Sequence, residues 1–416
     1  MTAPRARVAV LEAHDWGAWS ERHARGEVAG ELGPYGAQEL QRHGFALSWS
    51  DGAGRLPWRS PLLARPLRKL GTLRPELAGA RDALSSLRAI GAADLALAMF
   101  EDQGLAPAFL RAGGVPPFAS RPLVLVVCWL AETCRELDEG ALAAHRRALA
   151  GADRVCFFSR NQAEVFEREL GVPGERLRCV PFGIDDRFFA VAAHDSEHEP
   201  RGEPSASSQE SSASEPYVLA IGRDRSRDHR TLLDAVRGTD IPVLLVAPQS
   251  QLAALAPPNV RVLESVDHRG YRDLLARAAV VAVPTTAPRY PSGQTVVLEA
   301  MAMGKALVTS DSPAMRDYVQ DGRTGLLTAP GEPRALAEAL AALLADPGKR
   351  CALGAAAREA VCARFNHRTM WAALAGVLAE LTPRERAQPA GRVWRLASTS
   401  RTSPMSSARS ASSRSR

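Results

Sequence analysis

The chain has 416 residues, enough for two domains of ordinary size together with flexible segments. Because 46% of its residues are hydrophobic and 24% are charged, it has the composition of a folded globular protein and not of a disordered or fibrous one. The formal net charge is +6, but residues 382–416 carry eight Arg and one Glu and account for +7 of it. The rest of the chain is close to neutral, which argues against a nucleic-acid-binding fold.

Cysteine usage and apolar runs bear on the location of the protein. Its six cysteines include no Cys-x-x-Cys pair, as expected for reduced and mostly buried thiols. The short apolar run at the N-terminus does not make a signal peptide, and the longest apolar stretch, residues 123–130, is too short to cross a bilayer. We therefore expect a cytoplasmic protein.

In the first half of the chain, apolar runs of strand length alternate with stretches of helical period. Such alternation predicts βα units around a parallel sheet. The predicted strands span residues 7–11, 45–49, 94–100, 122–129, 154–159 and 176–182. The predicted helices include residues 36–43, 77–90, 139–150 and 160–170. Residues 1–190 are expected to form one doubly wound, Rossmann-like domain.

Residues 191–216 interrupt this pattern with Ser, Glu and Pro, which predicts a disordered linker. The pattern then resumes, with strands predicted at 217–222, 241–247, 260–265, 280–285, 306–310 and 324–329 and helices at 230–237, 269–278, 295–303, 333–345, 347–363 and 367–381. We expect a second α/β domain over residues 217–381 and a disordered basic tail over 382–416. Two such domains would enclose a cleft at the carboxyl ends of their strands, where these folds bind ligands.

Residues 280–330 contain the most informative local pattern. A predicted strand leads into a loop, and Ser292-Gly293-Gln294 opens a helix. The free N–H groups and positive dipole of a helix start, with a glycine for close approach, favour a bound phosphate. Glu299, one turn further on, is placed to accept hydrogen bonds from a diol such as a ribose. Alternatively, Ser292 only caps the helix and Glu299 is a solvated helix residue.

The segment LEAMAMGKALVTSDSPAMRDYVQDGRTGLLTAP, continuing to residue 350, resembles the C-terminal signature of glycosyltransferase family 4. This family consists of retaining GT-B-type transferases that use nucleoside-diphosphate sugars. The resemblance extends to residues 217–235 and to 154–189, where Gly183, Asp185 and Phe188 match a Gly-x-Asp-x-x-Phe pattern. Gly33 and Gly36 match, more weakly, the family's acceptor-side glycine loop. The resemblance implies a GT-B fold of two Rossmann-like domains facing a cleft.

By this resemblance, Arg223 corresponds to the Arg that contacts the donor diphosphate, and Arg227 stands where the family has a Lys. Arg225 and Arg230 are alternatives for the second position. Two cations facing the diphosphate stabilise the charge that grows as the glycosidic bond breaks. Glu299 corresponds to the acid that holds the ribose. The implied donor-binding residues are Ser292, Gly293, Gln294 and Thr295.

One departure from the family concerns the acid that usually contacts the donor sugar, because its position falls on Pro291. Either Ser292 or Gln294 contacts the sugar instead, or catalysis has been lost. The resemblance implies retaining transfer of a sugar from a nucleoside diphosphate to an unidentified acceptor, such as an envelope glycan or glycolipid, without cofactor or metal. The alternative is a catalytically degenerate GT-B protein that binds a nucleotide or serves in assembly.

Residues 55–71 suggest a contact with a membrane. They carry five cations and no acid, interleaved with Leu and Trp, a mixture typical of a segment on an anionic lipid surface. Three prolines argue against one continuous helix, and a solvated loop near the acceptor explains the same residues. Peripheral attachment to the inner face of the membrane is therefore a hypothesis beside that of a solvated loop.

Overall fold

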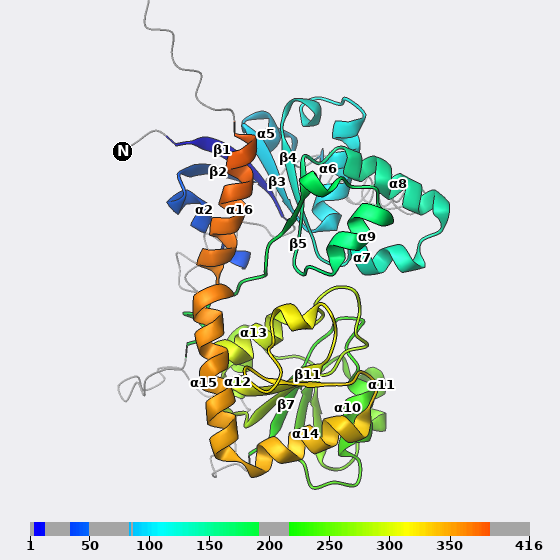
Figure 1. Cartoon of the computed structure of the whole chain (residues 1–416), viewed down its shortest axis with the longest axis vertical. Helices are drawn as coiled ribbons and strands as arrows, with labels where there is room; N and C mark the ends of the chain where they lie inside the picture. Colours follow the sequence, from blue (N-terminus) through cyan, green and yellow to red (C-terminus); the bar gives the residue numbers. More distant parts are fainter. Residues whose placement is uncertain (1–3, 13–33, 50–82, 85, 191–215, 383–416) are drawn as a thin grey trace, which may run out of the picture. The chain divides into compact units, whose positions relative to one another are not determined.

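Two parallel six-stranded sheets form the framework of the protein (Figure 1). The computed structural model describes residues 4–12, 34–49, 83–84, 86–190 and 216–382. The first sheet has the order β2-β1-β3-β4-β5-β6 and contains β1 (Ala6–Leu11), β2 (Phe45–Trp49), β3 (Leu95–Met99), β4 (Leu123–Val127), β5 (Arg154–Phe157) and β6 (Leu177–Cys179). The second has the order β12-β11-β10-β7-β8-β9 and contains β7 (Val218–Ile221), β8 (Val243–Val246), β9 (Val260–Leu263), β10 (Val280–Val283), β11 (Ala306–Ser310) and β12 (Leu326–Thr328). These are the twelve strands predicted from the sequence.

Helices connect the strands of each sheet. In the first half these are α2 (Glu39–Arg42), α5 (Leu87–Gly91), α6 (Glu101–Ala112), α7 (Leu130–Thr133), α8 (Glu139–Ala150) and α9 (Gln162–Arg168). In the second half they are α10 (His229–Val236), α11 (Gln249–Leu255), α12 (His268–Arg277) and α13 (Gln294–Ala302). Three further helices, α14 (Pro333–Ala345), α15 (Pro347–Arg364) and α16 (His367–Leu381), follow the last strand. This alternation confirms the doubly wound α/β architecture.

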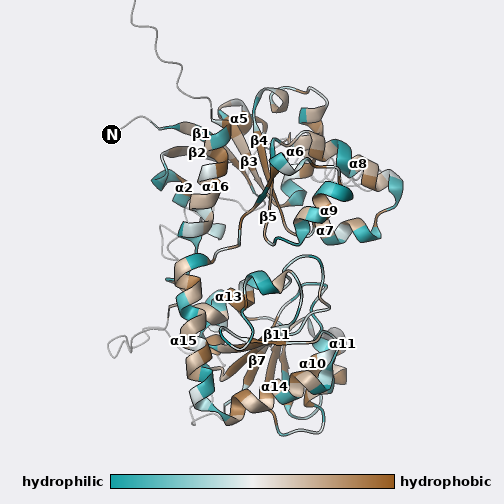
Figure 2. Cartoon of the chain, in the orientation of Figure 1, coloured by the Kyte–Doolittle hydropathy of each residue, from teal (hydrophilic) through white to brown (hydrophobic). Residues whose placement is uncertain are grey.

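The central strands are apolar along their whole length because helices cover both faces of each sheet. All five residues of β3 and all five of β4 are buried, and Figure 2 shows the strands of both sheets as hydrophobic. The register pairs Val8 of β1 with Leu47 of β2 and with Leu95 of β3. The apolar runs therefore show which residues form strands, and their complete burial is explained by the helices on both faces of the sheet.

Helix α6 has no counterpart among the helices predicted from the sequence, because Gly104 and Pro107 disturb its helical pattern. The structure explains the glycine. A Cβ atom at Gly104 would overlap the side chain of Leu125 in β4, so the helix packs onto the sheet only with a glycine at this position. Tertiary packing here outweighs the low helix propensity of Gly and Pro.

The last helix, α16, packs against elements of the first half of the chain. The indole nitrogen of Trp371 donates to the backbone carbonyl of Tyr35, and Glu380 forms ion pairs with Arg154 and Arg178 at 2.9 and 2.7 Å. The sequence placed residues 217–381 together in a second domain. In the structure, α16 lies beside α2 instead (Figure 1).

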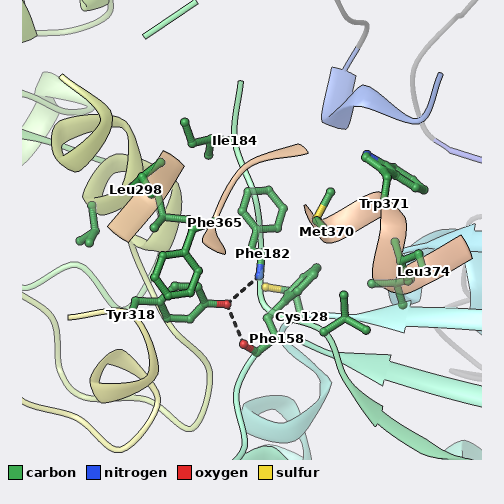
Figure 3. Packing of buried hydrophobic residues seen from close by; sticks show 14 of the residues in the cluster. Cys128, Phe158, Phe182, Ile184, Leu298, Tyr318, Phe365, Met370, Trp371 and Leu374 are labelled. Carbon is green, nitrogen blue, oxygen red and sulfur yellow. Dashed lines mark hydrogen bonds between the residues drawn. The ribbon is translucent and has the colours of Figure 1, made fainter. Parts of the chain in front are cut away.

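A buried cluster joins the side chains of both halves where the chain passes between them (Figure 3). The hydroxyl of Tyr318 donates to the carbonyl of Phe158 at 2.6 Å and accepts from the backbone N–H of Phe182 at 2.9 Å. Trp371 and Phe365 are among its most buried members. Residues 1–382 accordingly form one unit.

Four predictions concern residues outside the described ranges: Gly33, the segment 55–71, the linker 191–216 except Pro216, and the tail beyond residue 382. Within the described ranges, no helix is both long and apolar enough to cross a membrane.

Candidate functional site

The start of α13 has the backbone geometry predicted for an anion site. Strand β10 leads into a loop that ends at Gly293, whose φ of 79° places it in the left-handed region that favours glycine. A Cβ atom at this position would also overlap the guanidinium of Arg227 and the side chain of Val283. A glycine is therefore required at the helix start, both by its conformation and by the close approach of Arg227.

Arg227 is a buried cation beside this helix start. Its Nη2 donates to the carbonyl of Ile221, while its Nη1 is buried and has no hydrogen-bond partner among the described residues. Its guanidinium lies so close to Gly222 and Gly293 that a Cβ atom on either would overlap it. Burial lowers the pKa of Arg227 to about 10, although the charge of Asp224 acts in the opposite direction. The side chain remains cationic at neutral pH and has a donor to offer to an anion.

Glu299 lies one turn into α13 and is buried, with 6% of its surface exposed. Its Oε2 accepts a hydrogen bond from the hydroxyl of Tyr271, on α12, at 2.9 Å. Burial raises the pKa of Glu299 to about 8, and the hydrogen bond from Tyr271 only partly offsets this effect. Glu299 is therefore a buried carboxyl group that is largely protonated at neutral pH, and the interpretation as a solvated helix residue is excluded.

Asp224 connects the loop after β7 with the loop before α13. Its Oδ1 accepts hydrogen bonds from the hydroxyl of Tyr290 at 2.6 Å, the hydroxyl of Ser292 at 2.7 Å and the backbone N–H of Ser226 at 2.9 Å. Burial favours a higher pKa for Asp224, but the hydrogen bonds from Tyr290 and Ser292 outweigh it and hold the pKa below its usual value. Ser292 is therefore bound to Asp224 and does not act as the side-chain cap of α13.

Arg223 and Arg225, the other cations considered for the site, differ from Arg227 in exposure and in their partners. Arg223 is exposed and donates to the backbone carbonyl of Glu264 at 3.3 Å. Arg225 is also exposed and forms an ion pair with Glu136 at 3.0 Å. The structure thus places one of the two predicted cations, Arg227, against the helix start.

The remaining predicted residues have different surroundings. Gln294 is buried, and its Oε1 has no hydrogen-bond partner among the described residues. Thr295 is exposed. Gly36 lies in the first half against the ring of His367, where a Cβ atom would overlap the imidazole. Burial lowers the pKa of His367 to about 4, so this imidazole is neutral.

Sequence reasoning missed three residues of this site: Asp224, Tyr271 and Tyr290. Asp224 stands inside the arginine-rich run 223–230, where four cations give a stronger signal than a single acid. Tyr290 stands directly before Pro291, in the loop already recognised as unusual. Tyr271 has no signal in the sequence, because only the packing of α12 beside α13 brings it to Glu299.

The two halves also meet beside this loop. The backbone N–H of Arg289 donates to Glu132 at 2.8 Å, and its side chain forms an ion pair with Glu169 at 2.7 Å. The amide of Asn161 donates to the carbonyl of Arg289 at 2.8 Å. Residues of the first half thus hold the segment that leads to Tyr290 and Pro291.

Two parallel six-stranded sheets, each part of a Rossmann-like half of the chain, are typical of the GT-B class of fold. Solved structures agree: HepE of Anabaena, in complex with UDP-glucose, superposes with a TM-score of 0.63 at 18% identity over 90% of this chain and 100% of that chain. Sucrose-phosphate synthase from Thermosynechococcus elongatus gives a TM-score of 0.66 at 21% identity, covering 90% and 98% of the two chains.

Residues 215–346 match the family model of glycosyl transferases group 1, which confirms the resemblance to family 4 over this part of the chain. The D-inositol 3-phosphate glycosyltransferase of Xylanimonas cellulosilytica is 31% identical over 60% of this chain and 62% of its own length. The phosphatidyl-myo-inositol mannosyltransferase of Mycobacterium leprae is 35% identical over 35% of this chain and 41% of its own. The matched regions thus span about three fifths or less of these relatives.

Proposed function

We propose that the protein is a retaining glycosyltransferase that moves a sugar from a nucleoside diphosphate to an acceptor. The observation that carries this proposal is the buried guanidinium of Arg227, whose free Nη1 lies against Gly293 at the start of α13. A buried cation and the free N–H groups of a helix start converge there, and this combination suits a diphosphate. The match of residues 215–346 to glycosyl transferases supports the same conclusion.

In the proposed reaction, the bond between the anomeric carbon of the sugar and the diphosphate oxygen breaks, and negative charge grows on the departing diphosphate. Arg227 and the start of α13 stabilise that charge. Arg223, whose side chain is exposed, contacts the same group when the donor is bound. The departing diphosphate accepts the proton of the acceptor hydroxyl, so that no separate general base is needed.

Two buried side chains of α13, the carboxyl group of Glu299 and the amide of Gln294, recognise the donor. Glu299 accepts hydrogen bonds from the ribose diol. Gln294 offers its Oε1, which has no hydrogen-bond partner in the described part of the chain, to a hydroxyl of the donor sugar. The hydroxyl of Ser292 is engaged by Asp224, so Gln294 is the better replacement for the acid whose position Pro291 occupies. Thr295 contributes its backbone N–H to the diphosphate.

Relatives named for inositol 3-phosphate and phosphatidyl-myo-inositol favour a polyol or lipid-linked acceptor. Gly36 and Gly33 would lie on the acceptor side. The alternative function is nucleotide binding without transfer, which the loss of the usual sugar-binding acid at Pro291 favours.

Thermal-shift measurements with UDP, GDP, ADP and their sugar conjugates test the proposal. A nucleotide at a hundred times its dissociation constant adds about 2.7 kcal/mol to the free energy of unfolding, a clear rise in melting temperature. Repeating the measurement with EDTA tests the prediction that no metal is needed. Release of UDP, GDP or ADP from the stabilising sugar conjugate separates an active transferase from a protein that only binds. No stabilisation by any of these compounds would contradict both functions.

Membrane contact through residues 55–71 is a separate proposal. Each cation near an anionic bilayer contributes about 1 kcal/mol of binding, so three engaged side chains are expected to give salt-sensitive cosedimentation with acidic vesicles and little with neutral ones. Equal recovery in the supernatant with both kinds of vesicle at low salt would contradict it.

A further inference from the structure

The hydrogen bonds of Asp224 join two loops that are more than 60 residues apart in the sequence. Tyr290 and Ser292 donate to the same oxygen, Oδ1, at 2.6 and 2.7 Å. These two donors flank Pro291, and both are buried. The hydroxyl of Tyr290 also lies 3.1 Å from that of Ser226, which strengthens the connection from the other side. A single carboxylate therefore holds both ends of the turn around Pro291.

The same residue determines the turn that carries Arg227. The backbone N–H of Arg227 donates to the carbonyl of Asp224 at 3.0 Å, and the N–H of Ser226 donates to its carboxylate. The guanidinium then fits between Gly222 and Gly293 with no room for a Cβ atom on either side. A small shift of one loop relative to the other would separate Nη1 from the start of α13.

We propose that Asp224 is the positioning residue that locks the loop after β7 to the loop before α13 and thereby aligns Arg227 with the diphosphate subsite. The inference rests on the proposed function, since it assumes that a nucleoside diphosphate binds there. Asp224 forms no ion pair with Arg227 within the described residues. It acts through the two loops and through the charge that it places near the buried cation.

The chemistry of the contact fits this role. Hydrogen bonds to a carboxylate are shorter and stronger than those between neutral groups, and three donors on one oxygen leave little freedom for the loops. An asparagine at position 224 keeps an acceptor oxygen but loses the charge. An alanine loses both, so the two substitutions separate the hydrogen bonds from the charge.

The test compares binding of UDP, GDP and ADP with binding of uridine, guanosine and adenosine, by calorimetry and saturation-transfer NMR. Asp224→Ala is expected to weaken binding of the preferred diphosphate by about tenfold or more and that of its nucleoside by less than twofold, because only the diphosphate reaches Arg227. Asp224→Asn is expected to give a smaller loss. Combining Tyr290→Phe with Ser292→Ala should reproduce most of the Asp224→Ala effect, since it removes two of the three hydrogen bonds and keeps the charge. The control is Asp240→Ala, which removes an exposed acid of the same half.

Adding Asp224→Ala to the Tyr290→Phe and Ser292→Ala variant should cause a smaller loss than Asp224→Ala causes in the wild type, since only the charge and the contact with the backbone N–H of Ser226 are left to remove. The inference would be overturned if the losses of diphosphate affinity in these variants were fully additive. It would also be overturned if Asp224→Ala left the diphosphate affinity unchanged, or if it weakened binding of nucleoside and diphosphate equally. If the wild-type protein binds none of the three diphosphates, the proposed function fails and this inference fails with it. If the wild-type protein binds and the variants behave like Asp240→Ala, only the role of Asp224 is refuted.

Discussion

Replacing Arg227 by Met is expected to weaken nucleoside diphosphate binding strongly while leaving the unliganded protein as stable as before, or more stable. Arg227 is buried and forms no ion pair with any residue that the structure describes, and desolvation of its charge opposes folding. A hydrogen bond to a charged group contributes about 1.5–3 kcal/mol, so its loss corresponds to roughly 10- to 150-fold in affinity. Calorimetric titration with UDP, GDP and ADP measures the affinity, and thermal unfolding without nucleotide measures the stability.

Arg230→Met is the matched control for this variant, because Arg230 belongs to the same arginine-rich run and its side chain is 85% exposed. It should bind the same nucleotide as tightly as the wild type. Arg223→Met should show an intermediate loss, larger in turnover than in binding, because its contact with the diphosphate develops as charge grows. Normal affinity in Arg227→Met would remove Arg227 from the diphosphate subsite.

The affinity for a nucleoside diphosphate is expected to rise by about tenfold between pH 7 and pH 9. Burial raises the pKa of Glu299 to about 8, so roughly a tenth of this group is ionised at pH 7 and nine tenths at pH 9. The ionised form accepts hydrogen bonds from both hydroxyls of a ribose, so binding favours it. The phosphates are already ionised above pH 7, and Arg227 keeps its charge until about pH 10.

The free energy of unfolding should show the opposite trend. A buried acid whose pKa is raised from 4.5 to about 8 destabilises the folded state increasingly as the pH rises through this interval. Glu299→Gln should remove both trends, and its affinity should be independent of pH between 7 and 9 and lower than that of the wild type at pH 9. A wild-type affinity that does not change over this range would contradict the contact between Glu299 and the ribose.

Much of the fold was predictable from local sequence. Buried strands of parallel sheets have continuous apolar runs, such as LALAM in β3 and LVLVV in β4, and these runs can be recognised in the sequence alone. Helix α6 was not predicted, because Gly104 and Pro107 lower its helix propensity and the reason for Gly104 lies in the sheet beneath the helix. The position of α16 also depended on the tertiary structure, since an apolar helix face does not indicate which half it will cover.

For the candidate site too, some features could be predicted from the sequence and others depended on the tertiary structure. The sequence determined that a glycine opens a helix after a strand, with Glu299 one turn further on, because these features depend on neighbouring residues. Only the tertiary structure decided which arginine of the 223–230 run is buried and what holds it there. Arg227 and Asp224 stand in one loop and Tyr290 in another that is distant in sequence, and burial shifts their pKa values only after both loops have packed together. Desolvation is a property of the folded surroundings, and it turns an ordinary helix glutamate into an acid with a pKa of about 8.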